Sequence, residues 1–345
     1  MQVYEKRPWI AASASYDSQA QSLIDLIPRV WSQIQALAPK RPSRLSIVGI
    51  GASHAAAAAP AYRLRADGID ASRFLASELP AGTATGDGLT ILVSQSGRSA
   101  EVVDLAKRVG GGAGLALTNY YPSPLTAVCG AELNLGNLSD SSVSFVSFTG
   151  TILALALLAD YWAGRDQLAH WQSLVSRTAE AVLAADQDLD GVAARLVACP
   201  TVDFVAPASA LSIAEEAALM FREGPRLMAT GMETRQYLHG PMDAAKTAGH
   251  VVFGGAREAV LIDQLKEQTE SLVYVTGQGA GAVKVPTWLT LDLPVSVDDG
   301  IGFSLAGSMV AQRLTLHASR HRSIDINEAV FVRLDTKTDR VGMPA

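Results

Sequence analysis

The residues best suited to chemistry are six small or polar ones at positions 94–99, Ser-Gln-Ser-Gly-Arg-Ser. They follow a five-residue apolar run at 89–93, which has the length and composition of a buried strand. After them, residues 100–108 carry apolar side chains at helical spacing. A turn between a strand and a helix offers free backbone N–H groups at the positive end of the helix dipole. The 94–99 turn therefore predicts an anion site, and phosphate is its natural occupant.

The side chains of the 94–99 turn strengthen this prediction. Three serines and a glutamine add hydrogen-bond donors, Arg98 adds positive charge, and Gly97 lets the backbone approach a ligand closely. The alternative is an ordinary serine-rich turn that caps a helix and binds nothing.

The elements around this turn alternate between strand and helix. Strands are predicted at 45–50, 74–76, 89–93, 114–118 and 133–135, with an alanine-rich helix reaching residue 65 and a helix over 147–162. Such alternation predicts an α/β fold, in which helices cover both faces of a parallel sheet.

The second half of the chain repeats this order. Strands are predicted at 201–206, 250–254, 272–276 and 289–293, with an alanine-rich helix over 212–223. We therefore expect a helical lead-in (1–40), a first domain (41–165), a linking helix (166–195), a second domain (196–328) and a tail (329–345). The repeat also matches residues 93–97 with residues 275–279, where the serines are absent. One anion site per chain is expected, in the first half.

A dinucleotide site is a competing interpretation of the first half. Gly49 and Gly51 follow a predicted strand, as in the dinucleotide-binding fingerprint, but His54 stands where the third glycine belongs. Ser53, at the head of the following helix, suits a phosphate or a sugar hydroxyl better. A nicotinamide or flavin oxidoreductase is therefore the less favoured reading.

Two glutamates in the second half are candidates for proton transfer. Glu216, Met220 and Glu223 lie at i, i+4 and i+7, on one face of a predicted helix whose start a capping-box pattern places at Ser212. A carboxylate on a face directed at the core is costly unless it lines a pocket. The alternative is that both glutamates are solvated on an exposed face.

A histidine, His239, precedes a sharp turn at Gly240 and Pro241. A lone histidine in a loop is more often structural. Beside two glutamates, however, it fits aldose–ketose chemistry. That reaction needs one group to move a proton on the ring oxygen and another to move a proton between C1 and C2.

Five short motifs occur in order along the chain. They are Tyr4-Glu5-x-x-Pro8, Gly49-x-Gly51-x-Ser53, the 94–99 turn, Glu216-x-Ala218-Leu219-x-x-x-Glu223 and His239-Gly240-Pro241. Together they resemble the tandem sugar isomerase (SIS) domain family, in particular the isomerase half of glutamine–fructose-6-phosphate amidotransferases. The resemblance covers nearly the whole chain, from residue 1 to about residue 327.

The resemblance implies a fold and a set of roles. Each SIS domain would be a flavodoxin-like or Rossmann-like three-layer sandwich. Glu223 would move the proton between C1 and C2, with Glu216 beside it, and His239 of a neighbouring subunit would help to open the ring, which implies a homodimer. The residues implied in binding the phosphate and sugar are Ser53, Ser94, Gln95, Ser96, Gly97, Ser99, Val143 and Ser144.

The chain also departs from the family's pattern. The amidotransferases carry a lysine where this chain has Met220. Their C-terminal tail supplies a catalytic lysine that forms a Schiff base with the sugar, and Lys337 is the nearest candidate here. The glutaminase half is absent, so glutamine-driven amination is not expected of this chain.

Composition narrows the class of protein. The chain has 345 residues, 48% hydrophobic and 18% charged, which is enough to bury sizeable cores. A net charge of −6 without a basic block argues against a nucleic-acid partner, so an anion must be held by a local site. The two cysteines, Cys129 and Cys199, are far apart in the sequence and predict neither a disulfide nor a zinc site. Free cysteines are consistent with the reducing cytoplasm, where we expect the protein. We expect no signal peptide, because no apolar core follows residues 1–7, and no membrane span, because the apolar run 151–159 is short and ends at Asp160.

We therefore predict an enzyme that acts on a hexose or hexosamine 6-phosphate, by aldose–ketose isomerisation or by removal of an amine. No metal or organic cofactor is expected, since the proton transfers need only placed acid and base groups. The alternative is a non-catalytic phosphosugar-binding sensor or regulator. Met220 favours the sensor, whereas Glu223 and His239 favour the enzyme.

Overall fold

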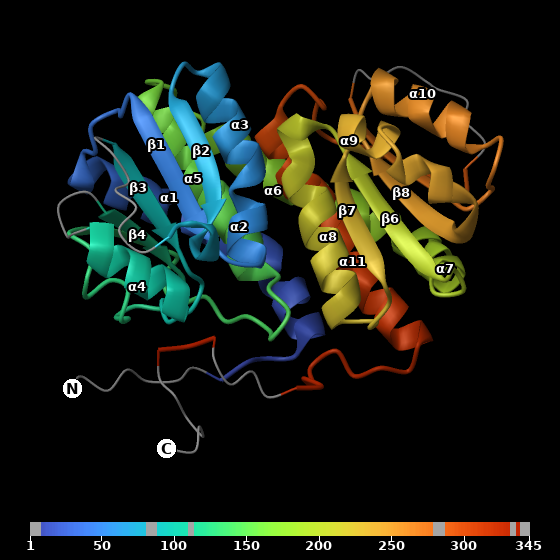
Figure 1. Cartoon of the computed structure of the whole chain (residues 1–345), viewed down its shortest axis with the longest axis horizontal. Coiled ribbons are helices and arrows are strands. Elements are labelled where there is room, and N and C mark those ends of the chain that lie inside the picture. The colour runs from blue at the N-terminus through green and yellow to red at the C-terminus, as the bar shows by residue number, and fades with distance from the viewer. Residues whose placement is uncertain (1–7, 81–87, 110–113, 279–286, 332–335, 339–345) are drawn as a thin grey trace. The chain divides into compact units, whose positions relative to one another are not determined.

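The computed structural model describes residues 8–80, 88–109, 114–278, 287–331 and 336–338 (Figure 1). The chain divides into two compact units. The first comprises Met1–Ile10, Gln21–Leu168 and Ala329–Ala345, and the second comprises Ala11–Ala20 and Ala169–Glu328. In the described residues each unit contains one five-stranded parallel sheet with helices around it, so the predicted α/β fold is confirmed. Of the five sequence motifs, Tyr4 and Glu5 lie outside the described residues.

The sheet of the first unit runs in the order β2-β1-β3-β4-β5. Its strands are β1 (Arg44–Gly49), β2 (Asp70–Leu75), β3 (Leu89–Val93), β4 (Gly114–Thr118) and β5 (Ala131–Asn134). The central strands β3 and β4 are continuous apolar runs because helices cover both of their faces. The strand order reverses between β1 and β3, and open α/β sheets bind ligands at the carboxyl ends of the strands beside such a reversal.

The helices of the first unit lie on both faces of this sheet. On one face, α2 (Ala52–Ala56) and α3 (Ala58–Ala66) pack against α5 (Val146–Trp162), while α4 (Ala100–Val109) connects β3 to β4 across the other (Figure 1). The alanine-rich helix predicted to reach residue 65 is divided at Ala57. Pro60 explains the division, because its ring clashes with the carbonyl group four residues earlier.

One buried carboxylate organises the entry to α5. Asp140 accepts backbone N–H bonds from Ser141 (2.8 Å), Phe145 (3.1 Å), Val146 (3.3 Å) and Ser147 (2.9 Å). The first N–H groups of a helix have no partner within the helix, so this carboxylate satisfies them. It also fixes the turn at 141–145 that leads into the helix. The helix itself is buried on every side, with Tyr161 as its one residue that is not buried.

The sheet of the second unit runs in the order β10-β9-β8-β6-β7. Its strands are β6 (Thr201–Ala206), β7 (Ala229–Glu233), β8 (Ala248–Phe253), β9 (Leu272–Gly277) and β10 (Leu289–Leu293). This is the order of the first sheet read from its other edge, so β6 takes the place of β1 and β8 takes that of β3. The sequence did not predict β7, an edge strand in which glycine interrupts any hydrophobic pattern.

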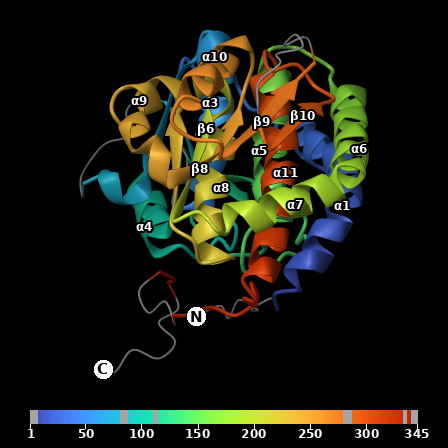
Figure 2. The same ribbon diagram turned by 90° about the vertical axis from the view of Figure 1, so that its right-hand side faces the viewer.

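The helices of the second unit differ from the predictions in two places. The linking helix expected over 166–195 is two helices, α6 (Leu168–Ala184) and α7 (Asp186–Leu196). Asp186 opens α7 and accepts a hydrogen bond from Arg313 (2.8 Å) on α11 (Gly300–His321), which α7 crosses and packs against (Figure 2). The capping box at Ser212 is also wrong. A 3₁₀ turn runs directly into α8 (Leu211–Glu223), and Ser212 is buried inside that helix.

The remaining elements are α1 (Ala12–Leu37), within the expected lead-in, and α9 (Thr234–Leu238) and α10 (Ala256–Leu265) of the second unit. None of the helices in the described part of the chain is long and apolar enough to cross a membrane.

The role of Asp140 predicts a large loss of stability when its charge is removed. Asp140→Asn keeps the size of the side chain but weakens four backbone hydrogen bonds, so the free energy of unfolding should fall by about 2–4 kcal/mol. Urea denaturation measures this. Asp104→Asn is the matched control, because Asp104 is exposed on α4 and pairs with Lys107 at the surface, and it should change stability by less than about 0.5 kcal/mol. Equal effects of the two substitutions would show that the carboxylate does not hold α5.

Candidate functional site

The strand order corrects the comparison of the two halves. Because β8 takes the place of β3, the counterpart of the 94–99 turn is the segment after β8, which begins at Gly254. The match with residues 275–279 is therefore wrong by one strand, and Gly279 lies outside the described residues. The segment that ends β9, Thr276-Gly277, corresponds instead to the end of β4 at Thr118. Local sequence misled here because both strands are apolar runs that lead into glycine.

The true counterpart already contains a negative charge. At the start of α10, Glu258 accepts a hydrogen bond from the backbone N–H of Gly255 (3.0 Å) and another from the hydroxyl of Thr234 (2.9 Å). This carboxylate is buried, and it sits where an anion would meet the helix dipole. The expectation of one anion site, in the first half, therefore has a physical reason that the sequence comparison did not supply.

The backbone of the 94–99 turn is tied to the loop after β4. The carbonyl of Gln95 accepts N–H bonds from Asn119 (3.0 Å) and Tyr120 (3.1 Å). Asn119 in turn exchanges two hydrogen bonds with the backbone of Leu138, at 2.8 and 2.9 Å. Leu138 lies two residues before Asp140, so a continuous series of bonds links the turn to the entry of α5.

Gly97 is required by the shape of this turn. Its φ is +62°, a conformation that other residues rarely adopt. A Cβ atom at this position would also lie 2.1 Å from the hydroxyl oxygen of Ser123. The sequence predicted that Gly97 lets the backbone approach a ligand closely, and the structure shows that Gly97 lies close to the side chains of Ser123 and Thr118.

The hydroxyl groups of the turn are oriented by their neighbours. Ser94 donates to the Oγ of Ser99 (3.1 Å), while Ser96 Oγ accepts from the backbone N–H of Arg98 (3.3 Å) and from Lys337 Nζ (3.2 Å). A serine hydroxyl has one hydrogen and two lone pairs. Ser96 and Ser99 therefore each keep a hydrogen that none of the described residues accepts. The Nε2 group of Gln95 is likewise shielded from solvent and has no acceptor among the described residues. Oxygens of a phosphate would satisfy these donors.

The other predicted binding residues lie at the same edge of the sheet. Ser53 is in α2, directly after β1, the strand that neighbours β3. Val143 is buried and Ser144 partly buried in the turn that Asp140 holds, where Ser141 Oγ donates to the Val143 carbonyl. The predicted binding residues thus come from three separate segments that follow the carboxyl ends of strands β1, β3 and β5.

The predicted catalytic residues of the second unit lie far apart within one chain. Glu223 is the last residue of α8, which runs back from the carboxyl end of β6 to the start of β7. His239 is exposed and follows α9, which begins at the carboxyl end of β7. The two residues therefore lie at opposite ends of the strands of this sheet. The length of β7 alone separates these ends by about 13 Å. Glu216 is buried, so the reading in which it is solvated is wrong, whereas Glu223 is partly buried.

A buried polar cluster that sequence reasoning missed anchors α9. Asp203 on β6 is in register with Thr230 on β7 and with His250 on β8. Its carboxylate accepts from the hydroxyls of Thr230 (2.6 Å) and Tyr237 (3.2 Å), and His250 Nε2 lies 2.9 Å from the same tyrosine oxygen. Burial lowers the pKa of His250, and burial with the nearby Asp203 raises the pKa of Tyr237, so both stay neutral. An aspartate inside the apolar run 201–206 was the available signal.

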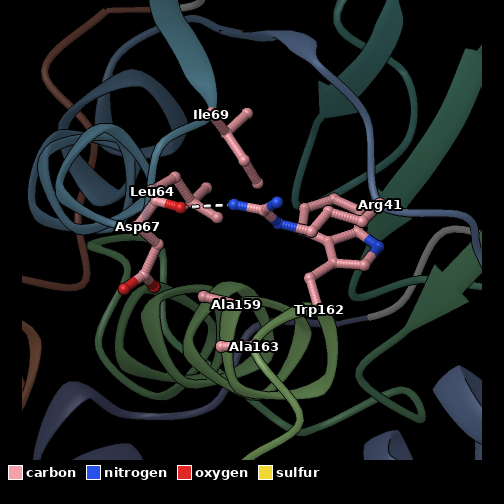
Figure 3. A pocket seen from close by; sticks show the side chains of 7 residues that line it. All are labelled: Arg41, Leu64, Asp67, Ile69, Ala159, Trp162 and Ala163. Carbon is pink, nitrogen blue, oxygen red and sulfur yellow. Dashed lines mark hydrogen bonds between the residues drawn. The ribbon is translucent and has the colours of Figure 1, made fainter.

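A cavity lies at the amino ends of strands β1 and β2 and is separate from the predicted site at the carboxyl ends of the strands. Its volume is about 280 Å³, and its lining residues precede β1 and β2 or end α3 and α5 (Figure 3). Arg41 donates to the carbonyl of Asp67, whose carboxylate instead pairs with Arg165 (2.8 Å). The described residues contain no group of three or more His, Cys, Asp or Glu side chains that could hold a metal ion.

Comparison with known proteins identifies the fold. No protein-family model matches the sequence, and no curated protein matches it either. Solved structures do match. The C-terminal domain of glucosamine-fructose-6-phosphate aminotransferase from Francisella tularensis has a TM-score of 0.79 and 16% identity, covering 92% of this chain and 97% of that one. This chain has the sugar isomerase fold.

Two further structures share the sugar isomerase fold with this chain. Tagatose-6-phosphate ketose/aldose isomerase from Escherichia coli has a TM-score of 0.76 and 18% identity, covering 95% of this chain and 99% of that one. Glucosamine-6-phosphate deaminase from Thermotoga maritima has a TM-score of 0.66 and 18% identity, covering 92% and 98%. At these identities the likeness establishes the fold, and the chemistry has to be argued from the residues.

The geometry at Gly97 predicts that an added methyl group weakens anion binding. Gly97→Ala should weaken binding of inorganic phosphate at least tenfold, because the turn must open to relieve the contact with Ser123. Isothermal titration calorimetry measures the binding. Gly191→Ala is the control, since a Cβ there, within α7, has no atom from another part of the described chain within 4 Å. It should leave binding unchanged and raise helix stability by about 0.5–1 kcal/mol. Unchanged phosphate binding by the Gly97 variant would remove the turn from the site.

Proposed function

We propose that this protein is an enzyme that acts on a hexose 6-phosphate or a hexosamine 6-phosphate by proton transfer between C1 and C2. The observation that carries the proposal is the 94–99 turn. Its hydroxyl and amide donors, which have no acceptor among the described residues, gather at a helix N-terminus beside the reversal of strand order. Support comes from the matched structures, whose names include an aminotransferase, an isomerase and a deaminase of sugar 6-phosphates.

The proposed roles follow the chemistry of an aldose–ketose interconversion. The turn binds the phosphate, and His239 moves the proton on the ring oxygen so that the sugar opens. Glu223 takes the proton from C2 and returns it to C1, while the hydroxyl proton passes between the two oxygens. Glu216 holds the sugar or the adjacent backbone. The residues proposed to bind the phosphate and sugar are Ser53, Ser94, Gln95, Ser96, Gly97, Ser99, Val143 and Ser144.

An amino sugar would use the same proton transfer. Moving the C2 proton of a 2-amino aldose to C1 produces an imine at C2, and water then releases ammonia and leaves the ketose phosphate. No change in oxidation state is needed, so placed acid and base groups suffice for either substrate.

We further propose that the active protein is a homodimer in which His239 serves the partner's site. The separation of Glu223 and His239 at opposite ends of the strands of one sheet supports this arrangement. In a dimer, His239 of one chain can reach Glu223 of the other chain, although the two residues are distant within each chain.

A binding protein without turnover is the second candidate. Met220 favours it, because this side chain is fully buried on the face that Glu216 and Glu223 share and cannot transfer protons. The two candidates differ in one measurable outcome. The enzyme converts a sugar phosphate, whereas the sensor binds one and returns it unchanged.

A panel of hexose and amino-sugar 6-phosphates tests the proposal. Each compound is incubated with the purified protein, and formation of the ketose or aldose partner and release of ammonia are followed, with binding measured in parallel by calorimetry. Conversion of one compound supports the enzyme. Tight binding without conversion supports the sensor, and neither binding nor conversion contradicts both.

Glu223 is expected to be the residue on which turnover depends. Glu223→Gln keeps the shape of the side chain but removes the base, so kcat should fall by about 10²- to 10⁴-fold while phosphate binding changes little. Glu216→Gln should lower kcat less. Glu215→Gln, a partly exposed neighbour on the same helix, is the control and should leave kcat unchanged. Normal turnover by the Glu223 variant would make this glutamate structural.

Sharing of His239 between subunits predicts that two inactive variants can complement each other. Glu223→Gln and His239→Ala proteins are mixed and allowed to exchange subunits, and activity is then measured. Mixed dimers contain one site with both groups intact, so up to half of the wild-type activity per mixed dimer should return. Absence of recovery, with subunit exchange verified by mass, would contradict the shared site.

A further inference from the structure

We infer that Lys337 is a phosphate ligand that the C-terminal tail delivers to the 94–99 turn, and not a lysine that bonds the sugar carbonyl. The inference rests on the proposed phosphosugar function and assigns Lys337 a role that the family resemblance did not imply. Its basis is the contact of Lys337 Nζ with the Ser96 hydroxyl at 3.2 Å, between residues 241 positions apart in the sequence.

The backbone of the tail sets the position of this lysine. Thr338 N–H donates to the carbonyl of Arg98 (3.0 Å), and Ala100 N–H donates to the carbonyl of Thr336 (3.3 Å). The two bonds form an antiparallel bridge that pairs Ser99 with Lys337. The amine therefore reaches the turn because the backbone on both sides of Lys337 is bonded to the turn, and not only through a flexible side chain.

The contact determines which way the Ser96 hydroxyl donates. Its oxygen accepts from the N–H of Arg98 and from Lys337, and these two bonds use both lone pairs. The single hydroxyl hydrogen then has to be donated to a third group. Two incoming donors, one of them charged, also make the hydroxyl a stronger donor. Lys337 thus prepares Ser96 to donate to an anion and is itself a donor beside that anion.

The charges around the turn call for such a cation. A phosphate monoester carries a charge of about −1.5 to −2 at pH 7. The chain as a whole has a net charge of −6, and Glu101 places a carboxylate in the first turn of α4, beside the helix end that would face the phosphate. Arg98 is the cation within the turn itself, and Lys337 adds a second one from the tail.

The position of the amine disfavours a bond to the sugar carbonyl. In a hexose 6-phosphate the C2 carbon is separated from the phosphate-bearing C6 by four carbon–carbon bonds. An amine that contacts a phosphate-binding hydroxyl therefore lies at the wrong end of the substrate for Schiff-base formation. One lysine cannot occupy both ends of the molecule at once.

Calorimetric titration with inorganic phosphate tests the inference without requiring turnover. Lys337→Met removes the charge and should weaken phosphate binding at least tenfold, because a charge-assisted hydrogen bond and an ion pair are lost. Lys337→Arg keeps the charge and should restore binding to within about threefold of wild type. Lys107→Met is the matched control, since Lys107 lies on α4 but pairs with Asp104 at the surface, and it should bind as wild type does.

Other outcomes would overturn the inference. If Lys337→Met binds phosphate as well as Lys107→Met does, the lysine is not a ligand. If borohydride traps a hexose 6-phosphate on Lys337, and Lys337→Arg binds phosphate normally but cannot turn over, the lysine bonds the carbonyl. Failure of the proposed function looks different, because the wild type would then bind phosphate with the Lys337 dependence and convert no sugar.

Discussion

The buried carboxylate of Asp140 is the interaction on which the carboxyl edge of the first sheet depends. It caps α5, the most thoroughly buried helix of the first unit, and it shapes the turn that contains Val143 and Ser144. Its segment also bonds to Asn119, and Asn119 bonds to Gln95 in the 94–99 turn. A buried charge is expensive to leave unpaired, so these loops are ordered together.

The two units share one strand order but differ at the helix start that follows the equivalent strands β3 and β8. In the first unit, the turn before α4 leaves hydroxyl hydrogens and an amide group without acceptors among the described residues. In the second unit, the equivalent helix start is closed by Glu258, which supplies the negative charge from within the chain. The same position in the sheet is thus available to a ligand in one unit and occupied in the other, and side chains near the helix start make the difference.

In the second unit, buried polar groups hold the very short helix α9 in place. A helix of five residues such as α9 is not stable alone, because its few hydrogen bonds do not offset the unfavourable free energy of helix nucleation. Tyr237 ties it to Asp203 and His250, and Thr234 ties it to Glu258. These anchors define where the chain leaves α9 and hence where the exposed His239 lies.

Much of the local structure followed from sequence because it depends on neighbouring residues. Strands such as β3, β4 and β6 have the predicted bounds, since a strand buried on both faces is a short and mainly apolar run. The 94–99 turn was recognisable as a connection because small and polar residues interrupt the apolar pattern between a strand and a helix. Edge strand β7 and the division of the linking helix were not predicted, because neither has a strong local sequence pattern.

Tertiary structure alone decided which segments meet. The pairing of β8 with β6 revealed that Glu258, and not residues 276–279, lies at the counterpart of the turn. The contact of Lys337 with Ser96 joins residues far apart in sequence, and no local pattern records it. The opposite placement of Glu223 and His239 follows from the direction of α8 against β7. Sequence by itself determined which residues could do chemistry here. Their partners were determined by strand order and chain direction, which are properties of the packed sheets and not of any single stretch.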